Sequence, residues 1–212
     1  MKRKMKGALV GKHGMKARYN CCCEFILLLT LERGHIMSEE RKQINYAVAC
    51  VSEFAHKYNL TIKEAFRFLF EYKAIEFLKE NYDIEHTLSL EDVLDDMMMI
   101  AKRTEEQAHD ISRNNQLVFI SYRESRKASK ESWCFIMTKQ EQLMEYNIQD
   151  IIEYMVKDLK IEYDKAMQLF YNSKTFDKLT DIETGLYLES SAYVYGIFQD
   201  ERNFGNLIQG EI

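Results

Sequence analysis

From Met37 onward, apolar residues recur three and four positions apart, which is the period of an amphipathic helix. The first stripe comprises Ile44, Ala47, Val48, Val51, Phe54, Ala55 and Tyr58. Thr61 and Glu64 have the spacing of a capping box that starts a second helix. Apolar spacing over 75–82 predicts a third helix, and Ser89 with Asp92 opens a fourth. The pattern predicts a four-helix module over residues 37–103.

The same layout returns over residues 137–212. Thr138 and Glu141 form another capping-box pattern, which precedes an apolar stripe of Ile148, Ile151, Ile152, Met155 and Leu159. The clearest correspondence aligns IEHTLSLE at 84–91 with IETGLYLE at 182–189, where five of eight residues are identical at an offset of 98. We therefore expect two related modules. Because such small cores are marginal alone, we expect them to pack on each other or on a partner.

The composition supports an all-α fold. The chain has no proline, and none of its eight glycines lies between Gly34 and Gly185. β-Sandwiches, Rossmann units and P-loop enzymes need glycine turns or cradles, so these classes are excluded. The expected architecture is two small modules of about four helices each, joined by an irregular segment.

That joining segment, residues 104–136, has a different character from the modules. Its run Leu117–Tyr122 is rich in β-branched and aromatic residues, which is typical of one short strand. A lone strand cannot satisfy its own edges. We therefore interpret 104–136 as a linker or as the remnant of a larger domain.

Residues 1–36 form a basic and apolar leader. The run Cys21–Leu31 is too short to span a bilayer and is interrupted by Glu24, and no small-residue cleavage site follows it. A purine-rich coding pattern at Glu32–Gly34 suggests that translation starts at Met37, which would make 1–36 upstream or disordered sequence. A weak membrane anchor is the alternative for this segment.

Charge and cysteine usage narrow the class of partner. Residues 37–212 carry 21 Lys or Arg against 32 Asp or Glu, which opposes phosphate binding, so no nucleic-acid partner is expected. The cysteines Cys21, Cys22, Cys23, Cys50 and Cys134 have neither metal-site nor disulfide spacing. We interpret them as reduced thiols of a cytoplasmic protein.

The candidate chemistry is sparse. Four acidic residues cluster at the start of the fourth helix, where the helix dipole favours them without any metal: Glu91, Asp92, Asp95 and Asp96. Met97–Met99 is interpreted as core filling. The charges of the helix-turn-helix-like segment 61–82 are balanced, which disfavours DNA binding. Neither a catalytic triad nor His or Cys ligand spacing is present, so no catalytic residue, metal or cofactor is predicted.

What remains is aromatic surface, because two small cores cannot easily bury 26 aromatic rings, 13 of them tyrosine. The candidates for a docking face are Tyr58, Phe70, Tyr72, Tyr171, Tyr187, Tyr193 and Tyr195. The alternative is that these side chains close their own cores.

Two resemblances bear on function. Residues 37–102 resemble the bacterial family called domain of unknown function 3791, through Glu53–Ala55, Leu60–Ala65 and Ile84–Asp92. Residues 137–212 resemble a companion family, through Phe176–Leu179 and Glu183–Ser190. These resemblances imply small helical proteins encoded beside a predicted ADP-ribosyltransferase-like toxin.

We therefore expect a non-enzymatic, antitoxin-like interaction protein whose partner is that neighbouring toxin or a second copy of the chain. The alternatives are a degenerate enzyme fusion, in which 104–136 is a fragment of the transferase-like domain, or a protein of no assignable activity.

Overall fold

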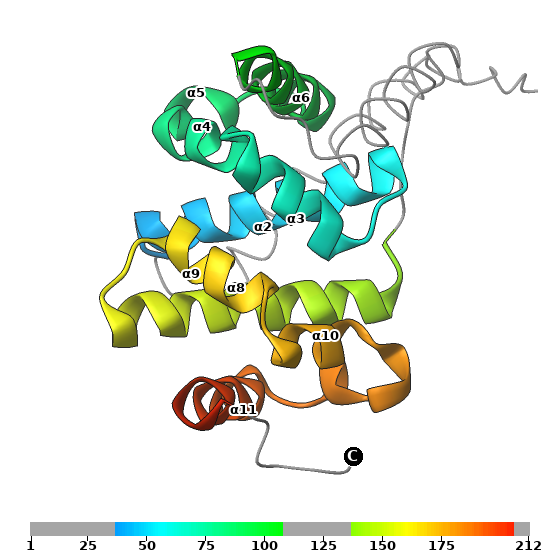
Figure 1. The fold of residues 1–212 in the computed structure, drawn as a ribbon, viewed down its shortest axis with the longest axis vertical. Helices are drawn as coiled ribbons and strands as arrows, with labels where there is room; N and C mark the ends of the chain where they lie inside the picture. Colours follow the sequence, from blue (N-terminus) through cyan, green and yellow to red (C-terminus); the bar gives the residue numbers. More distant parts are fainter. Residues whose placement is uncertain (1–36, 108–136, 206–212) are drawn as a thin grey trace, which may run out of the picture. The chain divides into compact units, whose positions relative to one another are not determined.

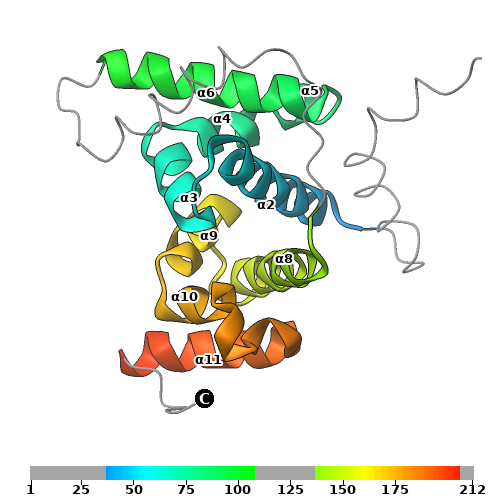
Figure 2. The ribbon, with the colours of Figure 1, turned by 90° about the vertical axis from the view of Figure 1, so that its right-hand side faces the viewer.

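The computed structural model describes residues 37–107 and 137–205, shown from two directions in Figures 1 and 2. Every regular element in these ranges is a helix, so the predicted all-α class is confirmed for them. The leader at 1–36, the expected strand at 117–122 and every cysteine except Cys50 lie outside the described residues. The described residues of both modules belong to one compact unit.

Module 1, residues 37–107, begins with two capped helices, as its sequence predicts. Ser38 accepts a hydrogen bond from the Arg41 backbone N–H, and Thr61 and Glu64 form a complete capping box. The third helix divides at Asn81, whose side-chain amide donates to the Phe77 carbonyl. The helices are α2 (Glu39–Tyr58), α3 (Ile62–Glu71), α4 (Ala74–Glu80), α5 (Tyr82–Glu85) and α6 (Leu90–Gln107).

Module 2, residues 137–205, repeats this order with one local change. Its capping box of Thr138 and Glu141 is confirmed, and Ser190 caps the last helix through the Tyr193 backbone N–H. Two short 3₁₀ turns stand where module 1 has α5 and the start of α6. The elements are α8 (Lys139–Leu159), α9 (Tyr163–Tyr171), α10 (Lys174–Thr180), η1 (Ile182–Thr184), η2 (Leu186–Leu188) and α11 (Ser191–Phe204).

The backbone supports the internal repeat independently of side-chain identity. Asn59 ends α2 and Lys160 ends α8 in the same left-handed conformation, with φ of 52° and 55°. The repeated 84–91 and 182–189 segments diverge in detail, because Gly185 adopts φ 65° between η1 and η2, whereas no residue of 84–91 has a positive φ. The two modules therefore share an element order but differ just before their last long helix.

Equivalent helices of the two modules pack on each other, as like elements do in a two-fold symmetric dimer. Helices α2 and α8 lie side by side and antiparallel (Figure 1). Arg41, near the start of α2, bonds Glu153 in the second half of α8. His56, near the end of α2, lies 3.9 Å from Glu141 at the start of α8. Helices α3 and α9 also meet, so the chain resembles a dimer within one polypeptide.

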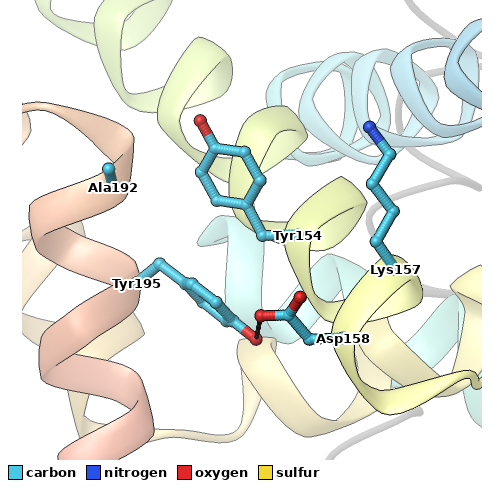
Figure 3. Close-up of a pocket in the computed structure, with 5 residues that line it drawn as sticks. All are labelled: Tyr154, Lys157, Asp158, Ala192 and Tyr195. Carbon is cyan, nitrogen blue, oxygen red and sulfur yellow. Dashed lines mark hydrogen bonds between the residues drawn. The ribbon is translucent and has the colours of Figure 1, made fainter.

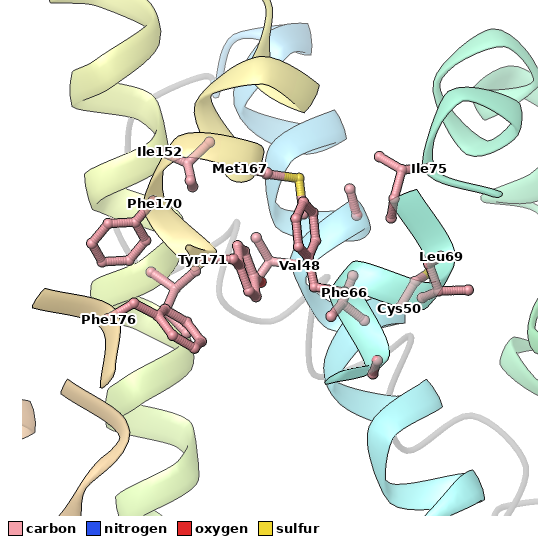
Figure 4. Close-up of a cluster of buried hydrophobic side chains, with 14 of the residues drawn as sticks. Val48, Cys50, Phe66, Leu69, Ile75, Ile152, Met167, Phe170, Tyr171 and Phe176 are labelled. Atoms are coloured by element: carbon pink, nitrogen blue, oxygen red, sulfur yellow. The ribbon is translucent and has the colours of Figure 1, made fainter. Parts of the chain in front are cut away.

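A single apolar core continues through both modules. Figure 4 shows Phe66 of α3 and Tyr171 of α9 face to face between the buried side chains of the two modules. Their ring centroids are 4.3 Å apart with an interplanar angle of 17°. Both rings are almost completely buried. The modules thus pack on each other through apolar surface, which supplies burial that neither core of this size provides alone.

No helix in the described ranges is both long enough and apolar enough to cross a bilayer.

Candidate functional site

Most of the seven aromatic residues predicted as a docking face are buried within the chain. The structure buries five of them: Tyr58, Tyr72, Tyr171, Tyr187 and Tyr195. Phe70 is half-buried, and Tyr193 is 38% exposed. The five buried rings therefore form part of the core of this chain, which was the alternative to a docking face.

Two of the seven lie at the contact between the modules. Tyr171 stacks on Phe66, and the Lys165 ammonium lies 5.3 Å from the centroid of the Phe70 ring. Burial raises the pKa of the Tyr171 phenol, and the nearby Glu145 carboxyl adds to the effect. The phenol therefore stays protonated at neutral pH and acts as part of the core.

A hollow of about 270 Å³ opens between α8 and α11 in module 2. Figure 3 shows its lining: Tyr154, Lys157 and Asp158 come from α8, and Ala192 and Tyr195 come from α11. The Tyr154 and Tyr195 ring centroids are 5.6 Å apart. The structure thus brings one predicted residue, Tyr195, together with four residues that the sequence did not single out.

The polar groups around the hollow are engaged within the chain. The Tyr195 hydroxyl donates to Asp158 over 3.0 Å, and burial together with this hydrogen bond raises the pKa of the Tyr195 phenol. The Lys157 ammonium pairs with Glu153 at 2.7 Å. In Figure 3, Lys157 extends away from the Tyr195–Asp158 pair. Because these groups do not converge on a common point, the hollow offers ring and methyl surface instead of a reactive cluster.

In module 1, fully buried residues stand at the positions equivalent to Tyr154 and Tyr195. Phe54 stands in α2 where Tyr154 stands in α8, at an offset of 100, and Leu94 stands in α6 where Tyr195 stands in α11, at an offset of 101. The exposed fractions of Phe54 and Leu94 are 0% and 1%. The hollow is therefore a feature in which module 2 departs from the repeat.

The acidic cluster at the start of α6 has local partners. The Ser89 hydroxyl donates to Asp92 at 2.6 Å, and Asp95 pairs with Lys57 at 2.8 Å. No group of three or more His, Cys, Asp or Glu in the part of the chain that the structure describes could hold a metal ion. Met97 and Met98 are buried in the core, whereas Met99 is 44% exposed.

Three of the four basic residues of the helix-turn-helix-like segment 61–82 contact the other module. Lys63 pairs with Asp177, Arg67 donates to the Asn172 side chain at 3.0 Å, and Lys79 pairs with Asp164 at 2.9 Å. A DNA-binding surface would need these cations to contact phosphates, but here they are engaged by module 2.

A buried polar seam between α2 and α8 was not predicted from the sequence. It comprises Ser52, Glu53, Glu145 and Gln149. The Gln149 amide donates to Glu145 Oε1 at 3.1 Å, while Oε2 is shielded from solvent and has no hydrogen-bond partner among the described residues. Glu53 is 5% exposed. The position of Glu145 on the same helix face as Ile148 and Ile152 could have indicated that its carboxyl lies against the core.

The environment of the seam changes the protonation of Glu145. Burial is the largest cause and raises the pKa of this carboxyl to about 7; the Ser52 hydroxyl opposes the rise and the Glu53 charge adds to it. One turn further along the α2–α8 contact, burial lowers the pKa of His56, although Glu141 partly compensates. The contact between the modules therefore contains one carboxyl, that of Glu145, whose charge changes near pH 7.

Comparison with protein families gives one match, which lies within module 1. Residues 45–103 match the family described as Protein of unknown function (DUF3791). The expected resemblance of module 1 is thereby confirmed. The chain matches no curated protein and no solved structure.

Proposed function

We propose that this protein is a non-enzymatic, cytoplasmic interaction protein that binds a protein partner through the hollow between α8 and α11. The observation that carries the proposal is the engagement of the hollow's polar groups with one another. With the Tyr195 hydroxyl on Asp158 and the Lys157 ammonium on Glu153, the accessible apolar surface is the Ala192 methyl and the partly exposed Tyr154 ring, beside the buried Tyr195 ring. Such a surface accommodates an apolar anchor side chain of a partner.

The surroundings of the hollow suggest the character of that partner. Leu188 and Tyr193, close to Ala192 in sequence, are 68% and 38% exposed. Residues 137–212 carry seven Lys or Arg against fourteen Asp or Glu. A protein that presents an apolar or aromatic anchor within a basic surface would complement both features.

The identity of the partner rests on resemblance. Proteins like the two modules are encoded beside a predicted ADP-ribosyltransferase-like domain, so we propose an antitoxin-like role toward a toxin of that type. The family match supports the membership of module 1 in a family of unknown function, and the hollow lies in module 2.

Co-purification of the full chain with the transferase-like protein encoded beside its gene tests the proposal. Ala192→Trp fills the hollow from an exposed position and should weaken the complex. Asn203→Trp, also exposed on α11, is the matched control and should bind like the wild type. The absence of a complex, or equal weakening by both variants, would contradict the proposal.

A further inference from the structure

Opposite charges meet across the contact between the modules, with cations on module 1 and carboxylates on module 2. Arg41 bonds Asp150 at 2.5 Å and Glu153 at 2.6 Å, Lys63 bonds Asp177, and Lys79 bonds Asp164 at 2.9 Å and Glu162 at 3.1 Å. For the Lys79 ammonium, burial lowers the pKa, but the hydrogen bonds and charges of Asp164 and Glu162 outweigh it and give a net rise.

Two of these pairs start from equivalent positions that carry opposite charges. Lys63 is the second residue of α3 and Asp164 is the second residue of α9. The Lys63–Asp177 pair joins α3 to α10, and the Asp164–Lys79 pair joins α9 to α4. Equivalent positions therefore carry a lysine in module 1 and an aspartate in module 2, and each pairs with an opposite charge on the third helix of the other module.

This reversal determines which modules can pair. Two copies of module 2 in the same arrangement would bring Asp164 of one against Asp177 of the other. They would also bring Glu141, which stands where module 1 has Arg41, against Glu153. Because both contacts occur twice across a two-fold axis, four like-charged pairs would oppose self-association.

Two copies of module 1 would be opposed less strongly. Lys63 would face α4, where Lys79 would repel it and Glu76 would attract it, and Arg41 would face Glu53, which is attractive. The charges at the contact therefore oppose the pairing of two copies of module 2 more strongly than the pairing of two copies of module 1.

We propose that the face of module 1 formed by α2, α3 and α4 is a recognition surface for an acidic four-helix module of the module 2 type. Here that module is supplied within the same chain, and the surface also binds such a module when a separate chain supplies it. The apolar Phe66–Tyr171 contact provides burial, and the reversed ion pairs select the partner.

The test starts from the folded full chain, with a protease site inserted between residues 108 and 136. After cleavage, the two parts should remain a 1:1 complex in size exclusion and native mass spectrometry. When an isotopically heavy cleaved chain is mixed with a light one, the modules should exchange into mixed 1:1 complexes. A dimer of module 2 alone, or separation of the wild-type parts at 50 mM NaCl, would overturn the proposal.

Charge reversal tests the selection itself. The double variant K63D/K79D should raise the dissociation constant of the cleaved parts about tenfold or more at low salt, and less at 0.5 M NaCl because of screening. Adding D164K and D177K should restore the affinity. K42D/K73D makes the same net charge change at residues paired within module 1, with Glu39 and Glu76.

That control should leave the dissociation constant within about twofold to threefold of the wild-type value. The D164K/D177K variant alone repeats the test from the other side if K63D/K79D does not fold. Unchanged affinity after reversal, or no recovery in the four-residue swap, would show that charge does not select the partner.

Discussion

Replacing Glu145 by glutamine should stabilise the protein above neutral pH and have little effect near pH 5. The pKa of this carboxyl is about 7 in the folded chain, against 4.5 as its ordinary value. The folded state therefore binds a proton that the unfolded state releases, so the free energy of unfolding falls as pH rises from about 4.5 to about 7. Above pH 7 that loss is complete.

The size of the effect follows from the shift. At 1.36 kcal/mol per pKa unit, the loss above pH 7 has an upper value of about 3 kcal/mol. Partial exposure of Glu145 outside its shielded Oε2 reduces the expected value to about 1–3 kcal/mol. The glutamine side chain of the variant would keep the size of the original and an acceptor for the Gln149 amide, but it cannot ionise. The gain in Tm at pH 8 should be about 2–10 °C.

Urea unfolding followed by circular dichroism at pH 5 and pH 8 measures the difference directly. Each variant is compared with the wild type at the same pH, because His56 contributes an opposite trend: its lowered pKa weakens the fold as pH falls through the His56 titration. Glu189→Gln makes the same charge change at an exposed site. Three outcomes would contradict this prediction: Glu145→Gln does not raise the free energy of unfolding at pH 8, it raises it equally at both pH values, or Glu189→Gln raises it as much.

Three further predictions test local features of the fold. Lys160→Gly should raise the free energy of unfolding by about 0.5–1 kcal/mol, because glycine adopts the observed left-handed φ freely. Asn59→Gly should raise it less, because asparagine already tolerates this conformation. Equal gains, or a larger gain for Asn59→Gly, in urea unfolding would contradict this. Tyr171→Phe should leave stability unchanged or raise it by about 1 kcal/mol, since the phenol oxygen has no hydrogen-bond partner among the described residues; a clear loss in thermal unfolding would show that the hydroxyl has a stabilising partner. Thr61→Ala should cost about 1 kcal/mol by removing the capping box, whereas Thr61→Ser should cost little; equal losses would argue against the cap.

The helical period and the cap residues were sufficient to predict the fold class and most of the elements. Thr61 and Thr138 were recognisable because a capping box depends on residues three positions apart. The repeat was also readable, because its members keep their order along the chain. The 3₁₀ turns of module 2 were not predicted, since the repeated 182–189 segment keeps its apolar residues while Gly185 changes the backbone path.

Long-range contacts were harder to predict because no local pattern encodes them. That the modules pack on each other was one of two expectations, but the pairing of α2 with α8 depends on surfaces about 100 residues apart. The aromatic count suggested a docking face, yet Tyr58 and Tyr72 are buried in the shared core. The hollow is lined by Ala192 together with Tyr154 and Tyr195. It depends on how these side chains pack, which cannot be predicted from residue type or spacing.

The most direct test of the proposed role is the dissociation constant between the full chain and an ADP-ribosyltransferase-like protein of the type proposed as its partner. Isothermal titration calorimetry with the wild type, Ala192→Trp and Asn203→Trp supplies it. The account predicts a 1:1 complex that Ala192→Trp weakens at least about tenfold while Asn203→Trp leaves it intact. Equal binding by all three proteins, or binding by none, would contradict it.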